Sequence, residues 1–135
     1  MEIKKVCPVI IREKNGLREI LAFRHPSAGV QIVKGTIEKD EDSNMAAMRE
    51  LAEESGITSV SSCEFKGSSD SITENQTWYF YNCIIDEDLK NAWDFFANED
   101  GGINFSFFWF NINEELSNDW HPIFHKALDY IKTNF

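Results

Sequence analysis

The sequence has few of the features that mark a secreted or membrane-spanning protein. Only 3 of its 135 residues are cysteines, and no two of them form a Cys-x-x-Cys pair. We therefore expect reduced, partly buried thiols and neither a disulfide framework nor a zinc knuckle. No apolar run approaches the about 18 residues that a membrane span needs. The apolar stretch over residues 6–11 is too short for a secretory signal. A cytoplasmic protein without membrane contact is the simplest interpretation.

Positive charge is also scarce. The 13 lysines and arginines oppose 23 acidic residues, which gives a formal net charge of −10 at pH 7. A surface this acidic repels nucleic-acid backbones and anionic lipids, which argues against nucleic acid as a partner. If the substrate is itself a phosphate anion, something must reverse the local sign. A divalent cation held by clustered carboxylates would do so.

The chain has no internal repeat, low-complexity tract or flexible linker, so residues 1–135 are expected to form a single domain. Strands are predicted on both sides of the Asn15-Gly16 turn signal and in the aromatic and β-branched stretches further along. Their ranges are residues 6–12, 17–23, 29–33, 63–66, 77–85 and 104–110. Helices are predicted over residues 43–55 and 121–133. This order indicates an α+β fold with a mixed β-sheet.

The predicted helix over residues 43–55 gathers acidic side chains on one face. At about 100° per residue, Glu50, Glu53 and Glu54 share a narrow arc. Their mutual repulsion, and the position of two of them in the last turn, cost the helix free energy that a bound hard cation would offset. Taken alone, the three glutamates fit a solvated acidic surface better than a metal site. The apolar residues of the helix are expected on the other side, packed into the core: Met45, Met48, Leu51 and Ala52.

The wider pattern around this helix is far more specific. Gly35 is followed after five residues by Glu41, and after seven more by the run Arg49-Glu50-Leu51-Ala52-Glu53-Glu54-Ser55-Gly56-Ile57. This spacing matches the Nudix box at each of its specified positions. The sequence therefore resembles the Nudix hydrolase family, and its order of strands and closing helix resembles the Nudix α/β/α sandwich.

The resemblance implies an enzyme that uses Mg²⁺ or Mn²⁺ to hydrolyse a phosphoanhydride bond in a nucleoside-diphosphate-linked small molecule. It places the principal metal ligands at Glu53 and Glu54, and assigns Glu50 as a further ligand or as the base for the attacking water. Arg49 and Glu41 would form the ion pair that orients Glu50. Because relatives are often dimers, a homodimer is included among the expected assemblies.

Residues outside the box helix complete the implied site. Lys34, which precedes the box glycine Gly35, would give a backbone carbonyl to the metal. In several subfamilies the base comes from a loop before the last strand, where Glu99 is the candidate and Asp100 the alternative. Arg24 and Lys34 are cations in an acidic protein, so we expect them to contact phosphate oxygens, with surface ion pairing as the alternative.

The substrate is indicated by weaker features. The run Val33-Lys34-Gly35 resembles the Pro-Lys-Gly of dinucleoside polyphosphate and diphosphoinositol hydrolases, and we take it to favour dinucleoside polyphosphates. The tyrosine that accompanies this activity is absent from residues 73–75, and Ile72 stands where a proline accompanies ADP-ribose hydrolysis. A nucleoside triphosphate pyrophosphohydrolase is one alternative. The other is a nucleotide-sensing Nudix module without turnover, against which the complete set of box glutamates argues.

Overall fold

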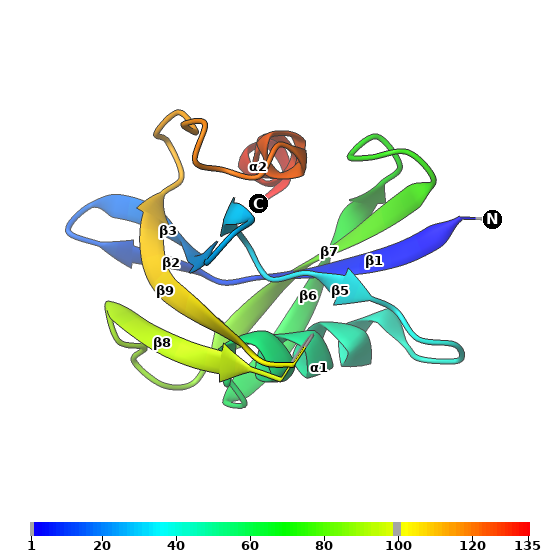
Figure 1. The fold of residues 1–135 in the computed structure, drawn as a ribbon, viewed down its shortest axis with the longest axis horizontal. Coiled ribbons are helices and arrows are strands. Elements are labelled where there is room, and N and C mark those ends of the chain that lie inside the picture. Colours follow the sequence, from blue (N-terminus) through cyan, green and yellow to red (C-terminus); the bar gives the residue numbers. More distant parts are fainter. Residues whose placement is uncertain (1, 99–100) are drawn as a thin grey trace.

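The computed structural model describes residues 2–98 and 101–135. Within these residues, five strands precede the first helix and four strands separate it from the closing helix (Figure 1). The elements are β1 (Ile3–Val9), β2 (Ile11–Lys14), β3 (Leu17–His25), β4 (Gly29–Gln31), β5 (Gly35–Thr36), α1 (Ser43–Ser55), β6 (Val60–Ser69), β7 (Gln76–Ile85), β8 (Ala92–Ala97), β9 (Ile103–Asn111) and α2 (Ile123–Asn134). The helix predicted over residues 43–55 has the predicted bounds, and the closing helix begins two residues later than predicted.

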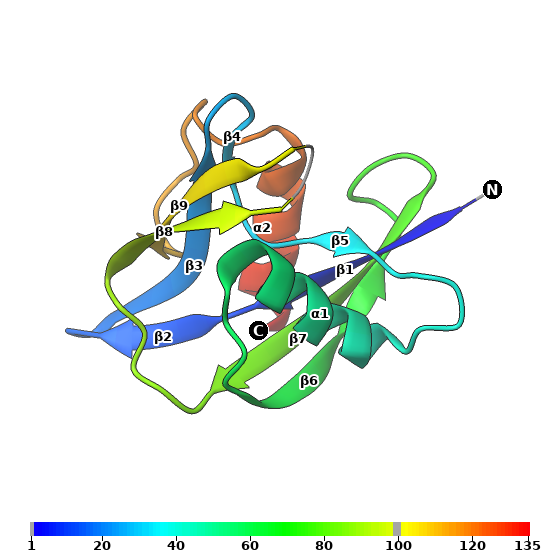
Figure 2. The same ribbon diagram turned by 60° about the horizontal axis from the view of Figure 1, so that its bottom comes forward.

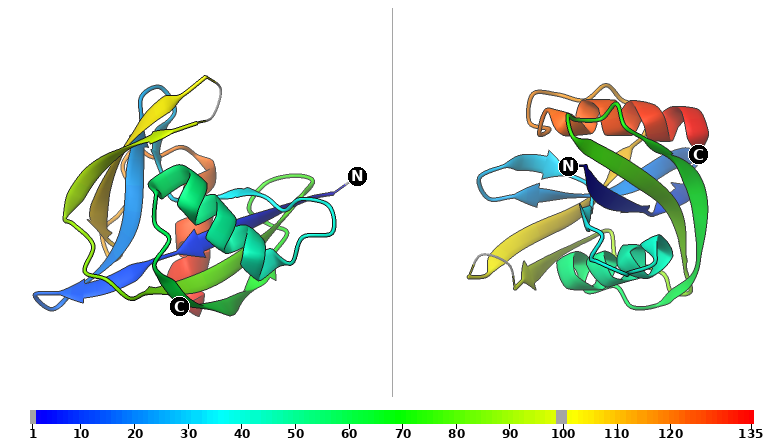
Figure 3. Two further views of the ribbon diagram at one scale, coloured as in Figure 1. Left: turned by 90° about the horizontal axis from the view of Figure 1, so that it is seen from below. Right: turned by 90° about the vertical axis from the view of Figure 1, so that its right-hand side faces the viewer.

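The strands form two sheets. The first has the order β5-β1-β7-β6 and is mixed, because β1 runs parallel to β7 while the other pairs are antiparallel. The second has the order β2-β3-β9-β8, with β4 added on β3, and is antiparallel throughout. The helices lie on opposite sides of these sheets (Figures 1 and 3). The α+β class and the mixed sheet are therefore confirmed.

Each helix covers its own hydrophobic cluster. Leu51 of α1 packs with residues from both sheets, including Val6 and Phe107. Helix α1 contacts β1 and β6 of the first sheet and β8 of the second (Figure 2). On the other side, Phe124 of α2 packs with Trp78 and other residues of the first sheet. Each such fully buried side chain stabilises the fold by roughly 1.5–3 kcal/mol. The box helix is thereby held against both sheets. No helix in the described ranges has the length and apolar character required to cross a membrane.

Several predicted strand bounds differ by a few residues; β6, for example, covers Val60–Ser69 and not only residues 63–66. Three differences are larger. The stretch over residues 6–12 is two strands, because the chain leaves the first sheet after Val9 and enters the second at Ile11. The strand predicted over residues 29–33 ends at Gln31, and the separate strand β5 starts at Gly35. Strand β8 was not predicted, although its burial alternates along the chain as expected for a half-exposed strand.

The inward face of α1 also differs from the prediction. The structure buries Ala46, Ala47, Glu50, Leu51, Glu54 and Ser55. Met45, predicted to be in the core, is 54% exposed, whereas Leu51 is fully buried as predicted. The helix is rotated so that two of its glutamates point inward. A core-facing carboxylate requires a polar partner or a bound cation.

Candidate functional site

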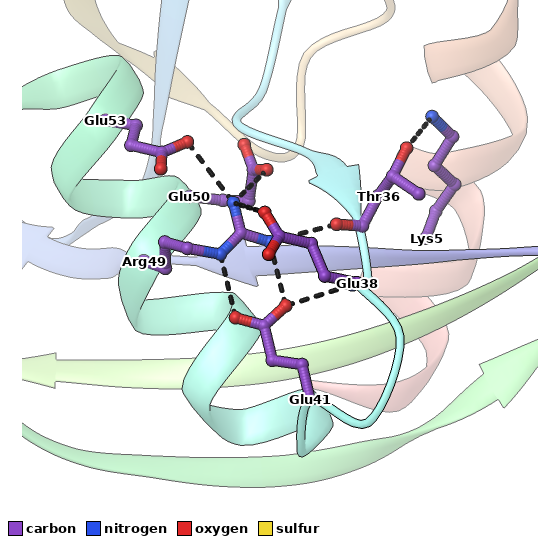
Figure 4. Close-up of polar contacts among 7 residues, drawn as sticks. All are labelled: Lys5, Thr36, Glu38, Glu41, Arg49, Glu50 and Glu53. Carbon is purple, nitrogen blue, oxygen red and sulfur yellow. Dashed lines mark hydrogen bonds and ion pairs between the residues drawn. The ribbon is translucent and has the colours of Figure 1, made fainter.

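The site is built on the turn that leads from β5 into α1. Helix α1 begins after Asp42, which is its N-cap residue but makes no side-chain capping hydrogen bond. The helix ends at Gly56, whose φ of 79° is left-handed and whose N–H donates to the carbonyl oxygen of Ala52. Glycine adopts this conformation without a Cβ penalty, as predicted for the residue after the helix. The loop between β5 and α1 carries Glu41, whose side chain points toward Arg49 of α1 (Figure 4).

Arg49 is the centre of the hydrogen-bond network. Its Nε donates to Glu41 Oε2 at 2.8 Å and its Nη2 donates to Glu41 Oε1 at 2.9 Å, which makes the pair bidentate. The same Nη2 donates to the carbonyl oxygen of Thr36 at 3.0 Å. The structure therefore contains the predicted Arg49–Glu41 pair. The guanidinium, together with the Glu38 N–H, lowers the pKa of Glu41 to about 2.

The third nitrogen of Arg49 holds two glutamates of α1. Nη1 donates to Glu50 Oε1 at 2.8 Å and to Glu53 Oε2 at 3.2 Å. Glu50 is only 6% exposed, and its carboxylate lies against Gly35. A Cβ at position 35 would be 1.9 Å from Glu50 Cδ. The absence of a side chain at Gly35 thus creates the space in which the Glu50 carboxylate sits.

The other two box glutamates are placed differently. The Glu53 side chain is 51% exposed, whereas Glu54 is buried. In the described residues, no group of three or more His, Cys, Asp or Glu side chains is assembled closely enough to hold a metal ion. The carboxylate oxygens of the box nevertheless fit a hard cation in their chemistry. Because Arg49 engages both Glu50 and Glu53, these carboxylates would have to turn from it toward the ion.

Lys5 is a site residue that the sequence analysis missed. It lies opposite Thr36 in the β1–β5 pair, and its Nζ donates to Thr36 Oγ1 at 2.7 Å (Figure 4). Burial and the nearby ammonium of Lys34 lower the pKa of Lys5, and the charges of Glu50 and Glu54 oppose this shift. The available signal was a lysine at the start of an otherwise buried strand. That lysine could be assigned to the site only once the long-range pairing of β1 with β5 was known.

Of the two predicted phosphate-contacting cations, the structure brings only Lys34 to this region. The Nζ of Lys34 is 6.0 Å from the centroid of the Trp78 ring and acts electrostatically on Lys5. Neither Lys5 nor Lys34 forms an ion pair with a carboxylate of the described residues. Arg24 is exposed, with its guanidinium 5.0 Å from the centroid of the Phe108 ring. Within the described chain, no hydrogen bond or ion pair joins Arg24 to the box helix.

Comparison with known proteins identifies the family. The family profile of the NUDIX domain matches residues 3–130. The chain belongs to the Nudix family. It is a Nudix hydrolase, a class of pyrophosphohydrolase that acts on phosphoanhydrides and that is typically dependent on a divalent metal. A search of curated proteins finds no match.

Solved structures of other Nudix proteins share the fold at low sequence identity. A MutT NUDIX hydrolase from Burkholderia pseudomallei aligns with a TM-score of 0.67 and 16% identity, over 97% of this chain and 98% of that one. The Ap4A hydrolase of C. elegans aligns with a TM-score of 0.62 and 18% identity, over 98% of both chains. The E. coli ORF135 protein aligns with a TM-score of 0.62 and 22% identity, over 98% of this chain and 91% of that one.

The candidate base outside the Nudix box belongs to the connection between β8 and β9. Glu99 and Asp100 lie outside the described residues, so their roles stay predictions. The strands on either side of them are paired from Ala97 with Ile103 onward, and β8 packs against α1.

Proposed function

We propose that this Nudix hydrolase cleaves a phosphoanhydride bond in a nucleoside-diphosphate-linked small molecule, with Mg²⁺ or Mn²⁺ bound by Glu50, Glu53 and Glu54. The arrangement around Arg49 carries the proposal. One nitrogen of its guanidinium binds both Glu50 and Glu53, while the rest is fixed by Glu41. A guanidinium held in this way orients the carboxylates before any ligand binds.

The proposed ligands have distinct roles. Glu53 and Glu54 are the principal metal ligands, and the backbone carbonyl of Lys34 completes the set beside Gly35. Glu53 is free to turn because its side chain is half exposed, whereas Glu50 is restrained by Gly35 and Arg49. When bound, a divalent ion neutralises phosphate charge and acidifies water. Lys5 and Lys34 would bind phosphate oxygens at the same edge of the site.

Two residues are candidates for the base that deprotonates the attacking water. Glu50 is held beside Gly35 by Arg49, at the position that the box assigns to a ligand or base. Glu99 would reach the same region from the β8–β9 connection. Substitution to glutamine removes the basic oxygen and keeps the size of the side chain. A large loss of kcat in Glu99→Gln assigns the base to Glu99, and a near-normal rate returns the role to Glu50.

We propose a dinucleoside polyphosphate as the preferred substrate class. Two observations support it: the Val33-Lys34-Gly35 run, and the ammonium groups of Lys5 and Lys34, which act electrostatically on one another and form no ion pair with a carboxylate in the described part of the chain. Two cations in one region of the site suit a chain of several phosphates better than a single diphosphate. Hydrolysis of nucleoside triphosphates is the competing outcome.

The deciding experiment is a substrate panel with Mg²⁺ or Mn²⁺, followed by identification of the products. The panel contains dinucleoside polyphosphates, nucleoside triphosphates, sugar nucleotides and dinucleotides. Glu53→Gln and Glu54→Gln should each lower turnover by orders of magnitude with the fold intact, whereas Glu115→Gln, an exposed carboxylate outside the site, should not. Unchanged activity in both box variants removes them from the metal site. Tight nucleotide binding without products indicates a sensing module.

A further inference from the structure

A pair of thiols lies outside the site described above. Cys63 in β6 and Cys83 in β7 are direct partners in the antiparallel register, and their Sγ atoms are 3.2 Å apart. Both are free cysteines in the structure. The third cysteine, Cys7, is fully buried in the hydrophobic cluster beneath α2, whereas Cys83 belongs to the cluster beneath α1. The pair is therefore separate from Cys7 and is formed by neighbouring strands.

The backbone already satisfies the requirements of a disulfide. Directly opposed residues of an antiparallel pair have Cα atoms about 4.5–5.5 Å apart. Disulfides are found at Cα separations of about 4.4–6.8 Å. Cys63 and Cys83 are such opposed residues, and their sulfurs face each other on the same side of the sheet. A bond between them needs side-chain adjustment and no rearrangement of the strands.

The two thiols are chemically unequal. Cys63 is half-buried, while Cys83 is 2% exposed. The hydrogen bond with Cys83 lowers the pKa of Cys63, since a donated S–H stabilises the thiolate. The same contact, followed by burial, raises the pKa of Cys83. Cys63 is thus the thiol that ionises first and meets solvent, and Cys83 is held in contact with it as a protonated partner.

We propose that Cys63 and Cys83 are an oxidation site at which a peroxide produces a reversible intramolecular disulfide. The Cys63 thiolate attacks one peroxide oxygen, the O–O bond breaks, and the released hydroxide takes a proton to become water. Cys63 is then a sulfenic acid. The Cys83 sulfur attacks the Cys63 sulfur, the S–O bond breaks, and the thiol proton leaves with the hydroxyl as a second water. Two thiols are oxidised and one peroxide is reduced.

The resulting bond would tie together the strands beneath the box helix. Cys83 packs in the same cluster as Leu51 of α1, and Cys63 packs against that cluster. The bond links positions 20 residues apart in the sequence. Closing a loop in the unfolded chain favours the folded state, so the oxidised protein should unfold at a higher denaturant concentration than the reduced protein. A small-molecule dithiol reverses the bond by thiol–disulfide exchange.

The test exposes the folded full-length chain to hydrogen peroxide and measures its intact mass and peptide map. The expected result is a loss of two hydrogen atoms, a link between Cys63 and Cys83, an unmodified Cys7 and recovery with dithiothreitol. Cys83→Ser should leave Cys63 as a sulfenic acid that dimedone traps, and Cys63→Ser should not react under the same exposure. Cys7→Ser is the matched control and should behave as the unsubstituted protein.

The measurement on the unsubstituted chain tests the proposal even if a cysteine variant fails to fold. The proposal is overturned if Cys63 advances to sulfinic acid, or if linked dimers form, without an intramolecular link. It is also overturned if the folded chain yields the same mixture of links, including those of Cys7, as the chain oxidised in concentrated guanidinium chloride. A selective link in the folded chain alone shows that the β6–β7 register directs the reaction.

Discussion

The carboxylate of Glu50 lies against the backbone of Gly35, where a Cβ atom would be 1.9 Å from Glu50 Cδ. Gly35 does not have a positive φ, so its requirement for glycine is one of space and not of backbone conformation. On its other side the same carboxylate accepts a hydrogen bond from Arg49. Two residues of the box therefore position Glu50: Gly35 leaves space for its carboxylate, and Arg49 donates a hydrogen bond to it.

Replacing Gly35 with alanine should displace the Glu50 carboxylate without unfolding the chain. A misplacement of about 1 Å in a catalytic group can cost about 100-fold in rate, and we expect a loss of kcat of that order. Steady-state kinetics of Gly35→Ala, Glu50→Gln and the double variant would check it. Because both substitutions act on one carboxylate, the losses should not add. Unchanged kcat in Gly35→Ala would show that Glu50 can move without consequence.

Features determined by local sequence could be predicted, and features determined by long-range packing could not. The helix over residues 43–55 was predicted because its periodicity and the terminal Gly56 are local signals, and the Nudix box supplied the Arg49–Glu41 pair. Strand β8 was missed because its half-exposed alternation is weak. Lys5 was missed because its place in the site depends on the pairing of β1 with β5.

The sequence did not predict which box glutamates face the protein interior. A helical wheel assigns charged residues to solvent, and it therefore turned Met45 inward. In the structure Glu50 and Glu54 face inward, and Met45 is exposed. The inward Glu50 accepts a hydrogen bond from Arg49, which Glu41 of the preceding loop holds in place, and the charge of Lys5 on β1 acts on it from further away. Such a site departs from the hydrophobic pattern because its chemistry requires buried oxygen donors.

The Glu41–Arg49 pair should make stability depend on pH in acid. The folded pKa of Glu41 is about 2, below the roughly 4.3 of an unfolded glutamate. Its contribution is therefore fully present above the unfolded pKa and is lost as the pH falls through the folded pKa. The difference in melting temperature between the unsubstituted protein and Glu41→Gln should be constant near neutral pH and shrink as the pH falls from about 4.3 toward 2. Glu115→Gln serves as the control, and a difference that is independent of pH would contradict the coupling.

Lys5→Met should weaken substrate binding more than catalysis. An ammonium bound to a phosphate oxygen contributes about 1.5–3 kcal/mol, so KM should rise by at least roughly tenfold with a smaller change in kcat. The rise should be greater for substrates with a longer phosphate chain. Lys4→Met is the matched control, because Lys4 is the exposed neighbour on the opposite face of β1. Equal KM values for the two variants would exclude Lys5 from the phosphate site.

Arg49→Lys tests whether shape or charge organises the site. Lysine keeps the charge, but its single ammonium cannot donate to both Glu41 oxygens, to the Thr36 carbonyl and to Glu50 at once. We expect kcat to fall roughly 10- to 100-fold, as when a residue that orients a ligand is lost. Stability should fall by about 1 kcal/mol, because Glu50 is buried and loses part of its hydrogen bonding. Kinetics and denaturant titration measure the two effects, with Arg18→Lys as the control. Full activity in Arg49→Lys would mean that positive charge alone suffices, and the bidentate contact with Glu41 would then have no role in orienting Glu50.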